Sequence, residues 1–145
     1  MDFSNGYCNR LFNPSLQGQE KKERKRIARK YDQLLIQKSG QVTTVKTKYK
    51  DSSNAYFFYP ILVDDRDRIA KALREKYGID TRIAYPMPVY KQEAYASGRL
   101  KFKKTNCPIA EKVTSKILNL PIYPGMTDDM INEVCQAIFK EIENV

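Results

Sequence analysis

The residues best suited to contact a ligand lie in a short segment with two prolines. Pro86 and Pro88 are separated by one residue, and each fixes its own φ and lacks an N–H donor, so the chain must leave this segment extended and rigid. Tyr85, Tyr90 and Gln92 are therefore held in a set direction, where they offer two phenols and an amide. A rigid loop with polar aromatic side chains is more typical of a binding edge than of a simple connection. The alternative is that both rings pack against helices and that Gln92 is solvated.

The composition excludes several classes of catalytic site. The chain has no histidine, so it has no Ser-His or Cys-His nucleophile pair and no histidine-ligated metal. The chain has three cysteines, Cys8, Cys107 and Cys135. Because their number is odd and they lie far apart in the sequence, they predict neither a disulfide framework nor a CxxC metal site. Without an imidazole to activate them, these cysteines are expected to be packing or surface residues. Acid–base chemistry would fall to Lys, Tyr, Asp or Glu.

The charge balance favours an anionic partner. The chain has 26 Lys and Arg against 17 Asp and Glu, a net charge of +9. A nucleic acid, a phosphorylated small molecule or an anionic patch on another subunit would suit this balance. The densest basic run, residues 21–26, is interpreted as the solvated face of a helix. The aromatic run 56–59 resembles a base-stacking platform, but Pro60 interrupts it and core packing explains it more simply, so nucleic acid is the least favoured partner.

Length and hydropathy predict one soluble domain. A chain of 145 residues buries about 68% of its unfolded surface, and 41% hydrophobic with 30% charged residues is ordinary for a globular protein. No apolar run approaches the roughly 18 residues of a membrane helix, and no signal-peptide pattern opens the sequence. We therefore expect a cytoplasmic protein without a membrane partner.

The apolar periodicity predicts four helices and three extended segments. The expected helices are 20–36, 66–77, 106–120 and a last one that begins after Thr127, and the expected extended segments are 42–49, 55–63 and 79–85. Asp64 or Asp65 is predicted to cap the second helix and Gly78 to end it in the left-handed conformation, and Thr127 is predicted to cap the last helix. Pro60 restricts the second extended segment to an edge or a bulge.

This order of elements predicts an α+β fold. About four helices would pack on one face of a small, mainly antiparallel sheet. Residues 1–19 are rich in Asn, Gly, Pro, Ser and Gln and are expected to be irregular, with a turn at residues 13–15. Residues 20–145 are expected to form the domain.

Three sequence blocks carry a resemblance to a known family. Residues 55–85 are expected to form a strand-helix-strand block whose proline loop continues through Gln92, and its Tyr85-Pro86-Met87-Pro88 resembles a Y-P-x-P segment. Residues 118–127, Leu-Asn-Leu-Pro-Ile-Tyr-Pro-Gly-Met-Thr, resemble an L-x-L-P-x-x-P-x-(M/L)-T signature, and residues 27–31 resemble part of a long basic helix. Together these blocks are similar to the C-terminal small domain of the DegT-type family of nucleotide-sugar aminotransferases, which depend on pyridoxal phosphate (PLP).

The resemblance implies a phosphate-contacting loop near the start of the chain. Residues 6–11, Gly-Tyr-Cys-Asn-Arg-Leu, are similar to the family's G-(Y/F)-N-x-R-(M/L) loop, which reaches the PLP phosphate of a neighbouring subunit. Cys8, Asn9 and Arg10 are thus the implied cofactor-binding residues, and residues 1–19 are implied to be a remnant of this loop region. Cys8 stands where the family has Asn and is a weaker donor, a role in which Asn9 would partly substitute.

The resemblance also implies roles for the proline loop. Tyr85, Tyr90 and Gln92 would line the entrance for the sugar or its nucleotide, and the family often has His where Tyr90 stands. No lysine matches the family's Schiff-base lysine, so the resemblance implies no catalytic residue and no metal ligand in this chain.

The implied reaction is the transfer of an amino group from an amino acid, usually glutamate, to a keto-sugar nucleotide, for polysaccharide or glycan precursors. We expect the isolated chain to be inactive and to bind no PLP by itself, because the family's lysine-bearing cofactor domain would lie elsewhere. The expected partner is that cofactor domain or an intact paralogous subunit, and the family forms homodimers. Two alternatives are a non-catalytic interaction module that pairs with an intact paralogue, and a basic nucleic-acid-binding domain.

Overall fold

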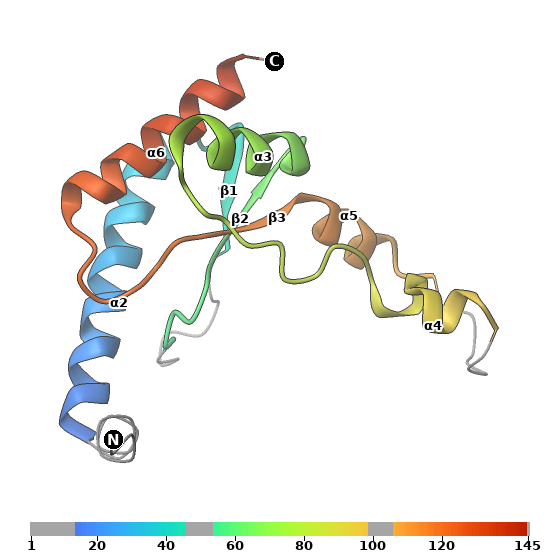
Figure 1. Cartoon of the computed structure of the whole chain (residues 1–145), viewed down its shortest axis with the longest axis horizontal. Coiled ribbons are helices and arrows are strands. Elements are labelled where there is room, and N and C mark those ends of the chain that lie inside the picture. Colours follow the sequence, from blue (N-terminus) through green and yellow to red (C-terminus); the bar gives the residue numbers. More distant parts are fainter. Residues whose placement is uncertain (1–13, 46–53, 99–105, 145) are drawn as a thin grey trace, which may run out of the picture.

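The computed structural model describes residues 14–45, 54–98 and 106–144 (Figure 1). In chain order its elements are α2 (Pro14–Leu35), the 3-10 helix η1 (Ile36–Lys38), β1 (Val42–Thr44), β2 (Tyr59–Val63), α3 (Arg66–Tyr77), the 3-10 helix η2 (Val89–Lys91), α4 (Glu93–Ala96), α5 (Pro108–Lys116), β3 (Ile117–Leu120) and α6 (Asp128–Glu143). The sheet has the order β1-β2-β3, and both pairs are antiparallel. The predicted α+β fold is confirmed.

The core lies between the sheet and the helices α2, α3 and α6. Helix α6 packs against both α2 and α3 (Figure 1), because its apolar residues recur every three or four positions and face inward. Strand β2 alternates buried and half-buried residues, as expected for a strand with one face on the core. The fully buried side chains include Ile27, Tyr31, Leu35, Ile61, Ile69, Leu73, Leu118, Ile131 and Ile138.

Two tyrosines join α2 to the sheet. The rings of Tyr31 and Tyr59 stack with centroids 4.8 Å apart. The Tyr59 hydroxyl donates to Asp32 at 2.7 Å, and the Tyr31 hydroxyl donates to the carbonyl of Pro121 at 2.9 Å. Burial raises the pKa of both phenols, so both stay protonated donors.

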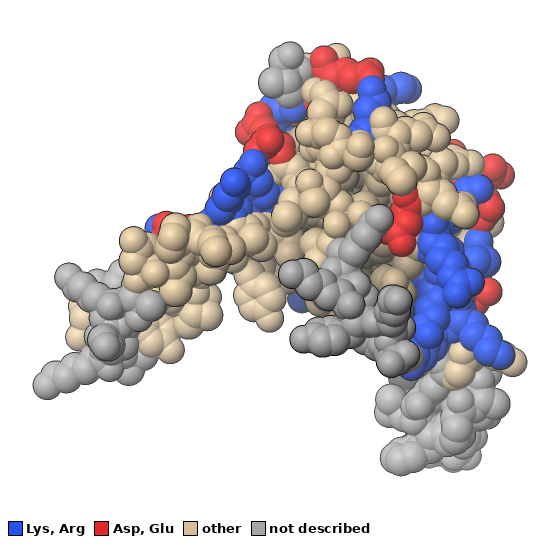
Figure 2. All heavy atoms as spheres, turned by 180° about the vertical axis from the view of Figure 1, so that it is seen from behind, with Lys and Arg blue, Asp and Glu red and all other residues tan. Residues whose placement is uncertain are grey.

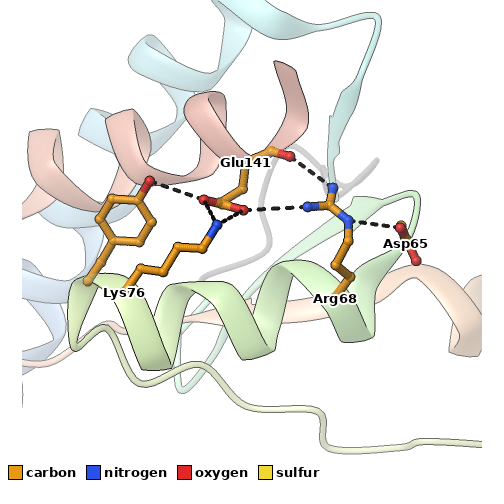
Figure 3. A network of polar contacts seen from close by, with 5 residues as sticks. Asp65, Arg68, Lys76 and Glu141 are labelled. Atoms are coloured by element: carbon orange, nitrogen blue, oxygen red, sulfur yellow. Dashed lines mark hydrogen bonds and ion pairs between the residues drawn. The ribbon is translucent and has the colours of Figure 1, made fainter. Parts of the chain in front are cut away.

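A buried carboxylate joins α6 to α3. Glu141 is 1% exposed and accepts from Lys76 Nζ at 3.0 Å and from Tyr77 Oη at 3.1 Å (Figure 3). Arg68 donates to both its side chain and its carbonyl, and Arg68 also bonds Asp65. A buried carboxylate is costly unless it is paired and hydrogen-bonded. The side chains that pair with this carboxylate all come from α3.

Two of the predicted helix ends are confirmed by the structure, and two differ from it. Thr127 caps α6 by accepting from the amide of Met130 at 3.2 Å, and Gly78 ends α3 with φ at 65°. Asp65 occupies the N-cap position of α3, but it has φ at 53° and its side chain makes no capping bond, since it accepts from Arg68 instead. Helix α2 begins at Pro14 rather than at residue 20, so the turn expected at residues 13–15 is wrong for Pro14 and Ser15; proline is tolerated in the first helical turn.

The extended segments are shorter than predicted. Strand β2 begins at Tyr59 rather than at residue 55, because Tyr56 takes a positive φ of 48° that no strand residue adopts. Pro60 fits its restriction, since among the described residues β1 pairs only as far as Ile61 and Pro60 pairs with Asn119 of β3 alone. Strand β1 covers residues 42–44 of the expected 42–49, and residues 46–49 lie outside the described residues.

Two further elements were predicted wrongly. Residues 79–85 form no strand, and only Arg82 pairs there, as a single antiparallel bridge to Asn119. The helix expected over 106–120 ends at Lys116, and Ile117–Leu120 is the third strand. The cause is pairing with β2, which places Leu118 opposite Ile61 and buries it completely.

Candidate functional site

The proline loop belongs to an arm that projects from the body of the molecule (Figure 1). We use "the arm" for residues 85–98 together with α5. Helix α4 lies at its outer end and α5 lies between α4 and β3, on the opposite side of the molecule from α2 (Figure 1). The loop that the sequence singled out is therefore displayed outward and is not folded into the core.

Polar contacts fix the base of the arm. Arg66, only 5% exposed, bonds the carbonyl of Thr114 and so joins α3 to α5. Lys116 forms an ion pair with Asp64 in the turn before α3. These two contacts attach α5 to α3 and to the turn before it, and so position the base of the arm relative to the body.

The start of the proline loop is fixed by Asn119 in β3. The amides of Arg82 and Asn119 each donate to the other's carbonyl at 3.0 Å, and the Asn119 side chain donates to the Arg82 carbonyl at 2.9 Å. Asn119 is 5% exposed, so these bonds are shielded from water. The chain thus leaves the sheet in one direction, three residues before Tyr85.

Tyr90 is held by a residue that the sequence did not single out. Its hydroxyl donates to Glu111 Oε1 at 2.7 Å, and Lys91 Nζ lies 2.7 Å from Glu111 Oε2. The bonds from Lys91 and Tyr90 hold the pKa of Glu111 below its ordinary value, and the bond to this carboxylate raises the pKa of Tyr90. Tyr90 is thus a neutral phenol that donates to Glu111 and also receives a hydrogen bond from the backbone of Cys107.

Tyr85 and Gln92 are exposed. The Tyr85 side chain is 63% exposed, and the backbone of Gln92 bridges η2 and α4, its amide bonding the carbonyl of Val89. No hydrogen bond or ring contact joins Tyr85 or Gln92 to Tyr90 in the part of the chain that the structure describes. The structure therefore places the three residues on one arm without linking their side chains.

The arm also exposes apolar side chains. Met87 is 43% exposed, Val89 53% and Ile109 79%. Large apolar residues gathered on one projecting element are typical of a surface that contacts a ligand or another polypeptide.

Arg82 covers an aromatic ring. Its guanidinium lies 5.4 Å from the ring centroid of Phe58, and the side chain is otherwise exposed. This placement agrees with an arginine that shields apolar surface. Of the aromatic run, Tyr59 lies in the core and Tyr56 packs against it, whereas Phe57 is 71% exposed.

The remaining candidate residues have simple outcomes. Cys8, Asn9 and Arg10 lie outside the described residues. Cys135 is buried, and burial raises the pKa of its thiol to about 12, so it is inert as expected. Cys107 is half-buried at the start of α5.

Three hollows lined by described residues have volumes of about 330 to 380 Å³, and Tyr85, Tyr90 and Gln92 line none of these three. Within residues 14–45, 54–98 and 106–144, no group of three or more cysteine and carboxylate side chains is placed to hold a metal ion. Over the same ranges, no helix combines the length and the apolar character needed to cross a membrane.

A three-stranded antiparallel sheet packed against α2, α3 and α6, with a projecting arm, defines an α+β domain. Residues 16–139 match the model of the DegT/DnrJ/EryC1/StrS aminotransferase family. The chain belongs to this family.

Individual relatives agree with this assignment. The chain is 30% identical to the dTDP-3-amino-3,4,6-trideoxy-alpha-D-glucose transaminase of Micromonospora megalomicea over 60% of this chain and 23% of that protein. It is 26% identical to the UDP-2-acetamido-2-deoxy-3-oxo-D-glucuronate aminotransferase of Pseudomonas aeruginosa, over 79% of this chain and 30% of that protein.

A solved structure shows the same fold. The crystal structure of DesV from S. venezuelae, in complex with a ketimine intermediate, matches with a TM-score of 0.72 and 26% identity, over 87% of this chain and 33% of that one. The chain therefore spans about a third or less of the length of these relatives.

Proposed function

We propose that this chain is the C-terminal small domain of a nucleotide-sugar aminotransferase and that its arm forms one wall of the substrate pocket. The observation that carries the proposal is the family match over residues 16–139, together with the fixed, outward display of the proline loop. The relatives named above act on dTDP- and UDP-linked sugars. The proposed reaction is the transfer of an amino group from an amino acid to a keto-sugar nucleotide, in the cytoplasm and within a dimer.

On this proposal Tyr85, Tyr90 and Gln92 contact the sugar or its nucleotide. Tyr90 donates a hydrogen bond to Glu111, and its oxygen would accept a sugar hydroxyl beside the bond that it receives from the backbone of Cys107. Tyr85 is exposed and would add ring surface, and the exposed Gln92 amide can both donate and accept. The wall would thus recognise hydroxyl groups and an apolar face, which together are characteristic of a sugar.

The family uses PLP, a cofactor that forms a Schiff base with a lysine and stabilises the electrons released at the substrate carbon. The described residues do not fit that group. Every described lysine is at least partly exposed, and Lys76 and Lys91 are paired with carboxylates that favour the charged ammonium. A Schiff-base lysine instead needs a low pKa, from burial or from a cationic neighbour.

We therefore propose that the catalytic lysine lies outside this chain, in a cofactor domain or an intact paralogous subunit, and that the chain alone is catalytically incomplete. Cys8, Asn9 and Arg10 remain our proposed contacts to the cofactor phosphate of a neighbouring subunit. The division into residues 1–19 and 20–145 also remains a proposal.

Saturation-transfer NMR of the purified chain with UDP-N-acetylglucosamine tests the wall. We expect signal transfer to the sugar protons that falls for Tyr85→Ala and Gln92→Ala, and that persists for the exposed control Lys112→Ala. Transfer that is absent, or that is the same in all variants, would remove the assignment of these residues.

A second candidate function has support from the exposed apolar side chains of the arm, Met87, Val89 and Ile109. They would equally suit a non-catalytic module that docks on an intact paralogue. Co-expression with such a paralogue, and separately with the paralogue's cofactor domain alone, distinguishes the two functions. A stable mixed complex with the paralogue at unchanged turnover favours the module, whereas turnover that appears only when the chain joins the isolated cofactor domain favours the aminotransferase.

A further inference from the structure

The outer side of α2 carries a row of side chains that the proposed function does not use. Lys22, Arg26, Arg29 and Gln33 follow one another at i, i+4, i+7 and i+11, so they lie on one face of the helix over about 16 Å. We call these four residues the α2 stripe. Figure 2 shows a continuous band of Lys and Arg along this side of the molecule, and Figure 1 places α2 on the opposite side from the arm.

The stripe borders a shallow hollow of about 330 Å³ next to the start of α6. The residues that line this hollow are Lys22, Arg26, Arg29, Lys30, Gln33 and Asp128. Arg26 donates to Asp128 Oδ1 at 2.6 Å and to the carbonyl of Met126 at 2.6 Å, and Lys30 lies 3.3 Å from Asp128 Oδ2. These contacts fix Arg26 and Lys30 in place, and they hold the pKa of Asp128 below its ordinary value, so this residue stays charged.

The fixed contacts leave a surplus of positive charge. Four cationic side chains line the hollow against the carboxylate of Asp128, and Glu23 pairs with Arg26 at 3.3 Å, which leaves an excess of two positive charges. Lys22 and Arg29 are exposed and form no ion pair with any residue that the structure describes. The carboxylates of Glu23 and Asp128 are taken up by Arg26 and Lys30, which leaves the cations of Lys22 and Arg29 available to a partner.

We propose that the α2 stripe binds an acidic segment of a partner protein, with Lys22 and Arg29 taking its carboxylates. The two cations are seven residues apart, about 10 Å along the helix, a spacing that an acidic helix or extended peptide can match. Arg29 offers a planar pair of donors suited to a carboxylate, and the Gln33 amide adds a neutral donor at one end of the stripe.

The same observations disfavour nucleic acid. No aromatic side chain lines the hollow, so the stacking surface that single-stranded nucleic acid uses is absent from it. Asp128 stands inside the hollow and would repel a phosphate backbone that runs along the stripe. A peptide can place a carboxylate at each end of the stripe and a neutral residue opposite Asp128.

Calorimetric titration of the purified chain with poly-L-glutamate near physiological salt tests the proposal. We expect binding that Lys22→Gln/Arg29→Gln weakens about fivefold, since each exposed ion pair contributes only modestly. The control Arg74→Gln/Lys112→Gln removes the same charge from exposed residues outside the stripe, and we expect it to change the affinity less than twofold. Thermal unfolding of both variants verifies that they remain folded.

Three outcomes would overturn the proposal. The first is an absence of poly-L-glutamate binding. The second is equal weakening by both double variants, which would show a general charge effect. The third is tighter binding of single-stranded DNA or of phosphatidylserine vesicles that depends on Lys22 and Arg29, which would assign the stripe to a different class of partner.

Discussion

The hydroxyl of Tyr90 lies 2.7 Å from Oε1 of Glu111, and this bond joins the proline loop to α5 across 21 residues of sequence. Lys91 occupies the other oxygen of the same carboxylate at 2.7 Å. Glu111 therefore holds two consecutive residues of the loop from one point on α5. Pro86 and Pro88 restrict the backbone of the loop, and the Glu111 carboxylate restrains the side chains of the two residues that follow.

Glu111→Ala should loosen the proline loop without unfolding the domain. The substitution leaves Tyr90 and Lys91 without their common acceptor, so we expect the amides of η2 to exchange hydrogen several-fold faster while those of α6 are unchanged. Hydrogen exchange followed by mass spectrometry measures both. The control Lys112→Ala removes the next side chain of α5, which is exposed, and should change neither; unchanged exchange in Glu111→Ala would show that the bond does not hold the loop.

The stability of the domain should fall in acid because of Glu141 (Figure 3). Its bond from Lys76 holds its pKa below the ordinary value of 4.5, so its contribution is present above pH 4.5 and is lost as the pH falls through the lower folded-state pKa. Glu141→Gln should therefore destabilise the protein at neutral pH, and its difference from the parent should shrink below pH 4.5. Urea unfolding over a pH series measures this difference, and a constant difference across the series would contradict the account.

Ile138→Ala should cost about 2–5 kcal/mol of unfolding free energy, because Ile138 is fully buried between α6 and the rest of the core. The matched variant Ile109→Ala, at a side chain that is 79% exposed, should change stability by less than about 0.5 kcal/mol. Urea unfolding measures both values. Equal costs would mean that the arm packs against something in the isolated protein.

Thr127→Ala should cost about 1 kcal/mol, because it removes the side-chain oxygen that accepts from the amide of Met130. Thr127→Ser keeps that oxygen and should keep most of the stability. Thermal unfolding of the two variants provides the comparison, and a loss of equal size in Thr127→Ser would point to the methyl group rather than to the cap.

Local sequence signals were sufficient for some elements and insufficient for others. The bounds of α3, its end at Gly78 and the cap at Thr127 follow from side-chain periodicity and turn chemistry within a few residues. Strand β3 does not follow from such signals. Ile109, Val113, Ile117 and Leu120 fit helical spacing throughout, and β3 buries three successive residues, so it lacks the alternation that identifies a strand.

In the candidate site, too, some features follow from the local sequence and others depend on tertiary contacts. Two prolines beside Tyr85 predicted a rigid, displayed loop, and the structure confirms its display on the arm. Glu111 was missed because its role depends on α5 lying beside η2, a tertiary contact for which the sequence carries no local mark. Its place in the first turn of α5 was equally consistent with a helix-dipole role.

The central claim is that this chain supplies a wall of the substrate pocket and not the catalytic lysine. The direct measurement is borohydride reduction of the purified chain after incubation with stoichiometric PLP, followed by peptide mapping. We expect no aldimine absorbance and no single lysine labelled above the others. Complete labelling of one lysine, together with amino transfer from glutamate by the chain alone, would contradict the account.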